Sequence, residues 1–377
     1  MACSTSFLQG QVPIQCQLCE TDPKIKWKCL QCNLLMCSKC KDKIHPKFKS
    51  ADEHKIVSLK ELSASSDQSN STTIKDTKKA ELYVTVDREF VIAFPYLYAL
   101  SSSSEESVWI CTENPIRGLS KSTTTKLLQK VRTTGYKLEP ISSFNIEIYD
   151  IAVTLSHDLL LVTDGKIKQI RDGANVVTDC NYSVAPLQPI SIHVTHDYKV
   201  IVGAAISGEL FSASGRRVVI IMDKYGIHQT VFEHDKKKEA LFTLPYRVLS
   251  TSNGTTVVLD RLSLECHGQL VFLGPGDRIN YYTGHPEINT MDKPFKPFDI
   301  AATSSGNIFV ADEFNLHILT CNGQLMAYYE MKTLGISNPH FLAINMSGRF
   351  SILYIGCSTT KESSDKCKLY RLNISGF

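Results

Sequence analysis

A pair of strand-like segments recurs six times between Pro95 and Tyr354, and this recurrence constrains the fold of the 377-residue chain most strongly. Each copy has an apolar strand, a Gly- or Asp-containing turn and a second β-rich strand, as in PFDIAATSSGNIFVAD from Pro297. The copies begin at Pro95, Ile148, Pro189, Pro245, Pro297 and Pro339, with a mean spacing of about 49 residues. That period suits one four-stranded propeller blade per copy.

The chain is therefore predicted to be mostly β, with a six-bladed β-propeller over residues 83–377. The strand near residues 83–94 is expected to complete the last blade, because closing the ring removes exposed strand edges. Two alternatives stay open, a seventh blade between residues 117 and 147 and a pair of β-sandwiches. The Thr-rich segment KSTTTKLLQKV, residues 121–131, is assigned to neither helix nor strand.

Cysteine spacing defines a second region near the N-terminus. From Cys16 the pattern reads C-x2-C-x9-C-x2-C-x4-C-x2-C-x4-H-x8-H. The eight candidate ligands are Cys16, Cys19, Cys29, Cys32, Cys37, Cys40, His45 and His54. Eight such ligands are what two tetrahedral zinc ions need, and a segment this short has too few apolar residues for a core of its own. The sequence predicts two zinc ions as cofactors.

A disulfide framework is the main alternative to zinc. The start of the chain shows no secretory signal and no segment is long and apolar enough to span a membrane. Thirteen cysteines in such a chain indicate a reducing compartment, so we expect a cytoplasmic protein with free thiols and no membrane partner.

The two regions together resemble the tripartite-motif (TRIM) NHL proteins. The cysteine pattern is similar to a B-box zinc finger, and PFDIAATSSGNIFVADEFNLHILTCNGQL is similar to an NHL repeat. The resemblance implies a RING-like cross-brace, with Cys16, Cys19, Cys37 and Cys40 on one zinc ion. Cys29, Cys32, His45 and His54 would then hold the other.

The domain organisation expected from this resemblance is a B-box-type finger at 14–60, a flexible linker at 61–82 and the propeller at 83–377. The linker is rich in Ser and Thr and has no heptad pattern, unlike the coiled coil usual in the family. The oligomeric state is therefore left open. The finger closes with His45 and His54, and no RING is expected in the fifteen residues before Cys16.

Partner-binding residues are predicted on loops at one face of the propeller, because a rigid ring usually binds through such loops. These candidates are taken as exposed and combine cations with aromatics: Lys168, Arg261, Lys293, Phe295, Lys296 and Phe314. The pairs Asp150 with Asp164 and Asp299 with Asp312 recur between repeats, which favours structural hydrogen bonding over catalysis. No catalytic residues are predicted.

These observations predict an adaptor, in which a zinc-binding B-box and an NHL-like propeller mediate protein–protein interactions. The family resemblance connects it to ubiquitin-ligase or post-transcriptional pathways. Two alternatives are ubiquitin-ligase or ligase-accessory activity of the B-box, and RNA binding by the propeller. Residues 63–377 carry 31 basic and 32 acidic side chains, which favours a protein or peptide partner over RNA. We do not expect an enzyme.

Overall fold

The computed structural model separates the chain into two compact units, Met1–Lys78 and Lys79–Phe377. It describes residues 16, 18–19, 26–29, 35–47, 54, 56–58, 82–94, 96–104, 106–115, 124–208, 211, 215–345, 351–359 and 366–375.

The N-terminal unit is a small three-stranded sheet with one short helix. Its elements are β1 (Trp27–Cys29), β2 (Leu35–Met36), α1 (Ser38–Lys43), the 3-10 helix η1 (His45–Lys47) and β3 (Ile56–Ser58). The strand order is β2-β1-β3, and both neighbours of β1 are antiparallel to it. None of the helices in the described residues has the length and apolar content that crossing a membrane requires.

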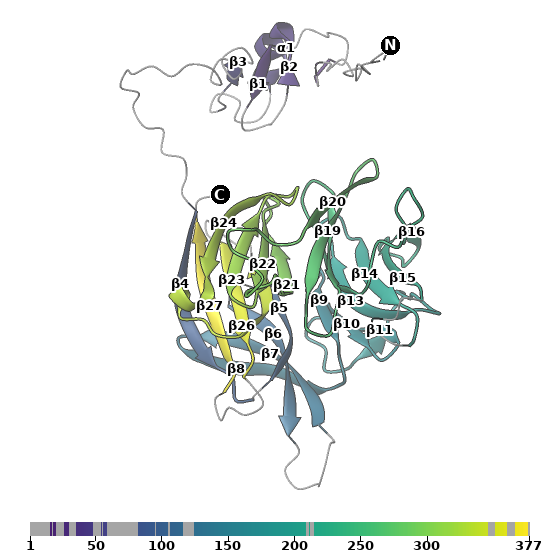
Figure 1. The fold of residues 1–377 in the computed structure, drawn as a ribbon, viewed down its shortest axis with the longest axis vertical. Helices are drawn as coiled ribbons and strands as arrows, with labels where there is room; N and C mark the ends of the chain where they lie inside the picture. The colour runs from purple at the N-terminus through teal and green to yellow at the C-terminus, as the bar shows by residue number, and fades with distance from the viewer. Residues whose placement is uncertain are drawn as a thin grey trace. The chain divides into compact units, whose positions relative to one another are not determined.

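The second unit is a six-bladed β-propeller in which each blade is a four-stranded antiparallel sheet (Figure 1). Blade 1 consists of β5 (Leu97–Ser104), β6 (Ser107–Pro115), β7 (Thr124–Thr134) and β8 (Lys137–Asn145). Blade 2 consists of β9 (Asp150–Val153), β10 (Leu159–Thr163), β11 (Lys166–Ile170) and β12 (Thr178–Asp179). Blade 3 consists of β13 (Gln188–Val194), β14 (Val200–Ala205), β15 (Arg217–Met222) and β16 (His228–Phe232).

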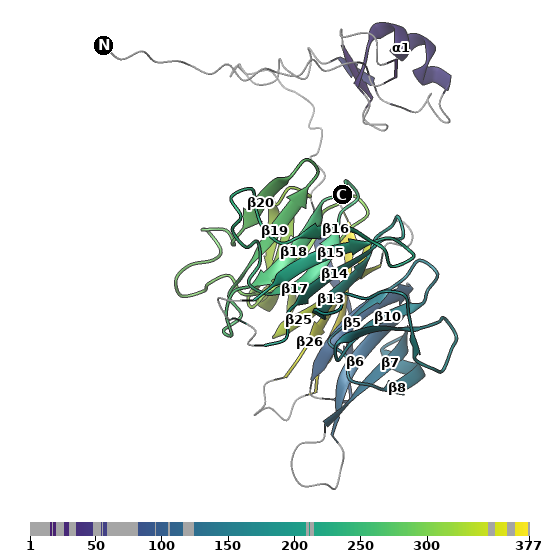
Figure 2. The ribbon, with the colours of Figure 1, turned by 90° about the vertical axis from the view of Figure 1, so that its right-hand side faces the viewer.

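The other three blades follow the same order. Blade 4 consists of β17 (Pro245–Ser250), β18 (Thr256–Arg261), β19 (Gly268–Gly274) and β20 (Arg278–Tyr282). Blade 5 consists of β21 (Pro297–Ala302), β22 (Ile308–Asp312), β23 (Asn315–Leu319) and β24 (Leu325–Glu330), followed by the 3-10 helix η4 (Met331–Leu334). Blade 6 consists of β25 (Pro339–Asn345), β26 (Ser351–Cys357), β27 (Lys368–Ser375) and β4 (Tyr83–Val91). Figure 2 shows the strands of blade 4 in the order β17, β18, β19 and β20.

Blade 6 closes the ring with strands from both ends of the propeller segment. Its outer strand β4 comes from the start of the segment and pairs with β27 from its end, for example Phe90 with Leu369. This pairing covers an edge of β27 that would otherwise present free N–H and C=O groups. The predictions of a mostly β, six-bladed propeller and of closure by the strand near residues 83–94 are confirmed.

Burial explains why the blade strands differ in sequence. The second strands are apolar on both faces because a neighbouring blade covers each face, so LLLVT of β10 and IFVAD of β22 are buried throughout. The outer strand β24 alternates half-buried and exposed residues. Six apolar clusters, each shared by two adjacent blades, form the core.

The described part of the 117–147 segment, residues 124–147, does not form a seventh blade. The undecided Thr-rich segment contributes to β7, and residues 137–145 form β8, so both strands extend blade 1 outward. A long hairpin therefore accounts for the wide spacing between the first two repeats. The described residues contain six four-stranded sheets and one three-stranded sheet, and the β-sandwich alternative is also wrong.

Close packing between blades 3 and 4 gives a direct test of this arrangement. A Cβ on Gly203 of β14 would overlap Ser191 Oγ and would lie 2.6 Å from the backbone oxygen of Pro245 in β17. Because the backbone cannot yield as a flexible side chain can, Gly203→Ala should lower the free energy of unfolding by about 1–3 kcal/mol. Urea unfolding of the full chain, followed by circular dichroism, measures the change.

The matched control is Gly274→Ala, where the nearest atoms to an added Cβ are 3.6 Å away. This substitution should leave the urea midpoint within experimental error of the wild type or raise it slightly, since alanine restricts the unfolded chain. Equal midpoints for the two variants would contradict the close approach of blades 3 and 4.

Candidate metal centre and propeller channel

Four cysteine sulfurs gather in the N-terminal unit. The Sγ atoms of Cys16, Cys19, Cys37 and Cys40 all lie within 4.8 Å of one another. Three of these cysteines are buried and Cys19 is half-buried. Helix α1 brings two of them together, because Cys37 is its N-cap and Cys40 lies in its first turn. The backbone N–H of Cys37 also donates to Cys16 Sγ at 3.3 Å.

A second group of donors lies in the same unit. It contains Cys29 at the end of β1, His45 in η1 and His54 before β3, again with ligand atoms within 4.8 Å. His54 Nδ1 and His45 Nε2 lie 3.4 Å apart. Cys32, the fourth ligand predicted for this group, lies outside the described residues.

The surroundings of Cys40 and His45 shift the pKa of each residue. Burial, together with the thiols of Cys19, Cys37 and Cys16, raises the pKa of Cys40. Burial and the neighbouring His54 lower the pKa of His45, so that its imidazole is neutral at pH 7. Neutral imidazole is the form that binds metal, and a cation that binds the thiols must displace their protons.

The first group can hold one metal ion. In a tetrahedral zinc site, Zn–S bonds of about 2.3 Å place sulfurs about 3.8 Å apart, which is compatible with four sulfurs that all lie within 4.8 Å of one another. Thiolates are soft ligands that favour zinc over the oxygen-binding cations. In the part of the propeller that the structure describes, no group of three or more His, Cys, Asp or Glu side chains comes close enough to hold a metal ion.

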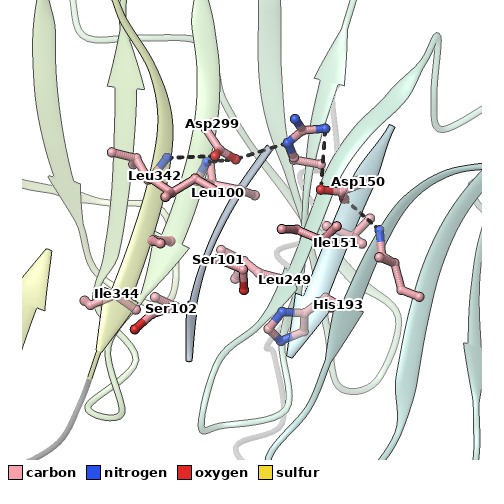
Figure 3. A pocket seen from close by; sticks show the side chains of 18 of the residues that line it. Leu100, Ser101, Ser102, Asp150, Ile151, His193, Leu249, Asp299, Leu342 and Ile344 are labelled. Carbon is pink, nitrogen blue, oxygen red and sulfur yellow. Dashed lines mark hydrogen bonds and ion pairs between the residues drawn. The ribbon is translucent and has the colours of Figure 1, made fainter. Parts of the chain in front are cut away.

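The propeller has a central channel lined by the six inner strands, with a cavity of about 250 Å³ (Figure 3). Five inner strands pair with their neighbours through a β-bulge near their first residues. The residue that follows the bulge is buried in each case. Together with Asp150, the start of β9, these residues form a ring: Ala99, Asp150, Ser191, Arg247, Asp299 and Phe341.

Three residues of this ring carry charges and contact one another across the channel. The guanidinium of Arg247 lies 3.3 Å from Asp299 and 3.9 Å from Asp150, measured between nitrogen and carboxylate oxygen. Figure 3 shows Asp150 and Asp299 pointing toward this group from opposite sides. Each carboxylate also accepts a backbone N–H of the next blade, from Ile192 to Asp150 at 2.9 Å and from Leu342 to Asp299 at 2.8 Å.

Burial dominates the electrostatics of this cluster. It raises the pKa of Asp299 to about 6, although Arg247 acts in the opposite direction. The pKa of Asp150 is raised for the same reason. Burial disfavours the charged form of Arg247, but Asp150 and Asp299 are among the groups that outweigh it and raise its pKa. Asp150 and Asp299 therefore join neighbouring blades, which agrees with the structural role predicted from their recurrence.

The predicted partner-binding residues are distributed over several blades. Lys293 and Phe314 are exposed and in contact, with the ammonium 5.6 Å from the ring centroid. Lys296 is half-buried and pairs with Glu313 at 3.1 Å. Lys168 lies within strand β11, paired with Leu161 and Asp179, and is half-buried.

Phe295 was predicted to be exposed, and this prediction is wrong. Its side chain is 6% exposed and packs edge-on against the rings of Tyr282 and His317, at centroid distances of 5.4 Å. His317 is itself held by hydrogen bonds of 2.8 Å to Tyr282 and to Asp312. Phe295, in the loop before blade 5, thus fills the space between blades 4 and 5. The sequence alone does not show this, because Phe295 stands among polar and charged residues.

Arg261 lies beside Tyr246 of the inner strand β17. It ends β18, is half-buried, and its guanidinium carbon lies 3.7 Å from the ring centroid of Tyr246. Sequence reasoning missed Tyr246, Arg247 and the other residues at the channel entrance. The signal that identifies them is their shared position in the repeats, one or two residues after the proline that starts most copies.

Comparison with known proteins shows the fold and no family. No protein-family model matches the chain, and none of the curated proteins matches it significantly. Among solved structures, one provisionally described as a gluconolactonase is 12% identical with a TM-score of 0.51, over 78% of this chain and 99% of that one. A calcium-binding protein, regucalcin, from Agrobacterium tumefaciens is 10% identical with a TM-score of 0.52, over 75% and 92%.

These likenesses define the class of protein as a six-bladed β-propeller, here preceded by a Cys- and His-rich unit. They also correct one prediction. The expectation that this chain is not an enzyme is wrong, because it was drawn from the architecture. A structure with the same fold carries the name of an enzyme, gluconolactonase. At 10–12% identity the likeness shows the fold alone, and function has to be argued from the sites.

Proposed function

We propose that this protein is an adaptor, in which a B-box-type module with two zinc ions and an NHL-like propeller each bind a protein partner. The observation that carries the proposal is the interleaving of the two ligand groups. Residues before and after Cys29 form the first group, whereas Cys29 itself belongs to the second with His45 and His54. Interleaving of this kind is the cross-brace that the resemblance to B-box fingers implies.

Surface features of the propeller support its assignment as the second binding module. It places cations in contact with aromatic rings, at Lys293 with Phe314 in loops and at Arg261 with Tyr246 on neighbouring strands. Aromatic and arginine side chains are enriched at the centres of protein interfaces. The ubiquitin-ligase and RNA-binding alternatives rest on the family resemblance, and the residues that the structure describes add no observation in favour of either.

The test combines metal analysis with interaction mapping. Elemental analysis of the purified full chain should give two zinc ions per chain. Proteins crosslinked to it in a ribonuclease-treated lysate should then be purified, and each should be titrated against the full chain by calorimetry.

Direct binding of a purified protein at micromolar affinity, together with two zinc ions, is the expected result. Capture that disappears on ribonuclease treatment would replace this proposal by RNA binding. Purified chain without zinc would remove the B-box part.

A further inference from the structure

Aromatic side chains surround one end of the propeller channel, and the β-bulges place them there. In five inner strands the pairing register skips one residue, which is Tyr98, Ile190, Tyr246, Phe298 or His340. The corresponding residue of blade 2 is Tyr149, just before β9. Five of these six residues carry aromatic rings. We call Tyr98, Tyr149, Tyr246, Phe298 and His340 the aromatic collar.

Each collar residue is exposed or half-buried, whereas the ring residue that follows it is buried. A bulge adds a residue to one strand and redirects its side chain, so this alternation is built into the backbone. The ring residues hold the blades together, whereas the collar residues keep part of their surface exposed at the entrance. The six apolar clusters between adjacent blades already form the core. The aromatic rings at these five positions are therefore not needed to complete it.

Cations lie against the collar. Lys126 Nζ is 4.7 Å from the ring centroid of Tyr98 and 4.8 Å from that of Tyr149. Its charge is neutralised by Glu147 at 2.6 Å. Phe298 and His340 stack on each other, with centroids 4.7 Å apart.

Arg261 differs from the other cations at this entrance. Lys126 and Arg247 are paired with carboxylates, but among the described residues Arg261 has no ion-pair partner. No acceptor in the described part of the chain reaches its buried Nε. A buried donor without an acceptor is costly, and an arginine stacked on a tyrosine is held in a fixed orientation. Among the described residues that line this entrance, Arg261 is therefore the cation whose charge no carboxylate neutralises.

A cavity of about 440 Å³ lies at this entrance, which is within the range of about 300–1,000 Å³ for ligand pockets. Its lining includes Tyr149, Leu244, Tyr246, Arg261 and Phe341. The cavity therefore offers apolar and aromatic walls for one large side chain, next to a single unpaired cation.

We propose that the aromatic collar binds an acidic peptide segment of a protein partner. An aromatic or aliphatic side chain of the peptide enters the cavity lined by Tyr149 and Tyr246, and an adjacent Asp or Glu carboxylate pairs with Arg261. This rests on the proposed function of the propeller as a protein-binding module. Charge selects a peptide over RNA: the cavity also contains the exposed Asp164, and a single unpaired arginine matches one carboxylate rather than a row of phosphates.

The test uses the full chain and three fluorescein-labelled peptides that differ at one position. Each is a nine-residue Gly/Ser peptide with a central Phe, followed by Glu, Gln or Lys. We expect the Glu peptide to bind at least about tenfold more tightly than the other two, as measured by fluorescence anisotropy, because only its carboxylate can form a charge-assisted hydrogen bond with Arg261. Arg261→Met should abolish this preference, and Arg261→Glu should shift it to the Lys peptide.

Two further variants separate recognition from loss of folding. Arg261→Lys keeps the charge and should retain a preference for Glu. Arg278→Met removes an exposed arginine at the start of β20, outside the lining of this cavity, and should bind all three peptides like the wild type. All variants are compared only after their thermal unfolding midpoints are shown to match that of the wild type.

Several results would overturn the proposal. Absence of binding by all three peptides, equal binding of all three to the wild type, or the same loss in Arg278→Met as in Arg261→Met would each do so. Tight binding of fluorescein-labelled oligouridine that depends on Arg261 would replace the peptide by single-stranded RNA. If a purified protein partner binds the wild type and Arg261→Met equally, the collar is not the docking site, but the proposed adaptor function stands.

Discussion

Replacing Arg247 by methionine is expected to lower the free energy of unfolding of the propeller by about 3–5 kcal/mol at pH 7.5, because it leaves two buried carboxylates without their cation. The Arg247 side chain is 7% exposed and lies between Asp150 and Asp299. Methionine keeps much of the side-chain volume. The loss in free energy of unfolding therefore comes mainly from the missing charge and not from a new cavity. Urea unfolding of the full chain measures the difference.

The deficit of Arg247→Met should shrink as the pH falls. Asp299 has its pKa raised to about 6 even with Arg247 present, and removing the guanidinium removes one cause that lowers it. A carboxylate whose folded pKa lies above its unfolded value of about 3.9 stabilises the protein when protonated, and that stability is lost as the pH rises through the folded pKa. The variant should therefore recover part of its stability between pH 7.5 and pH 5.5, relative to the wild type.

The matched control for this prediction is Arg216→Met. Arg216 pairs with Glu233 at 2.9 Å, but half of its side chain is exposed. Exposed ion pairs contribute about 0–1 kcal/mol, so this variant should remain close to the wild type at every pH. An Arg247→Met deficit no larger than that of Arg216→Met, or one that is constant from pH 7.5 to 5.5, would show that the Arg–Asp cluster does not link the blades electrostatically.

Cys29→Ala is expected to reduce the zinc content of the full chain from two ions to one or fewer and to unfold the N-terminal unit. Cys29 belongs to the second group of donors and also ends β1, the central strand of the small sheet. A segment with so small a core depends on metal for its folding free energy. Trp27 reports on this unit, because the only other tryptophan, Trp109, is in the propeller and can be replaced by phenylalanine.

Chelation should produce the same change without mutation. Excess 1,10-phenanthroline is expected to shift Trp27 fluorescence to that of the unfolded state, while the urea midpoint of the propeller stays unchanged. The control Cys180→Ala changes a half-buried cysteine of the propeller and should retain two zinc ions. Two zinc ions and native Trp27 fluorescence in Cys29→Ala would show that Cys29 is not a ligand.

Much of the fold could be predicted from local pattern. The spacing of the strand pairs predicted six blades, because each repeat corresponds to one blade. The closing role of the strand near residues 83–94 could also be predicted, because an open ring would leave strand edges unpaired. The spacing of cysteine and histidine likewise singled out the residues that gather in the N-terminal unit, because ligands of one ion must be brought together by short turns. Both kinds of signal are local in sequence, and for that reason they can be read without a structure.

The functional surface of the propeller could not be predicted in the same way. Phe295 looks like an exposed loop residue, but the neighbouring blade supplies Tyr282 and His317 to cover it. Tyr246 and Arg247 are adjacent in sequence, yet a β-bulge leaves the first half-buried at the channel entrance and the second buried between two aspartates. Exposure at these positions depends on partners from other blades.

The sequence by itself therefore determined the repeat, the strand character of the large unit and the candidate ligands, all of which follow from spacing along the chain. Only the tertiary structure decided which side chains of the inner strands bind blade to blade and which surround the channel entrance. The physical reason is that these contacts join residues of different strands. Arg247 meets Asp150 and Asp299 because the inner strands of separate blades converge on one axis. Arg261 meets Tyr246 because β18 folds back beside β17.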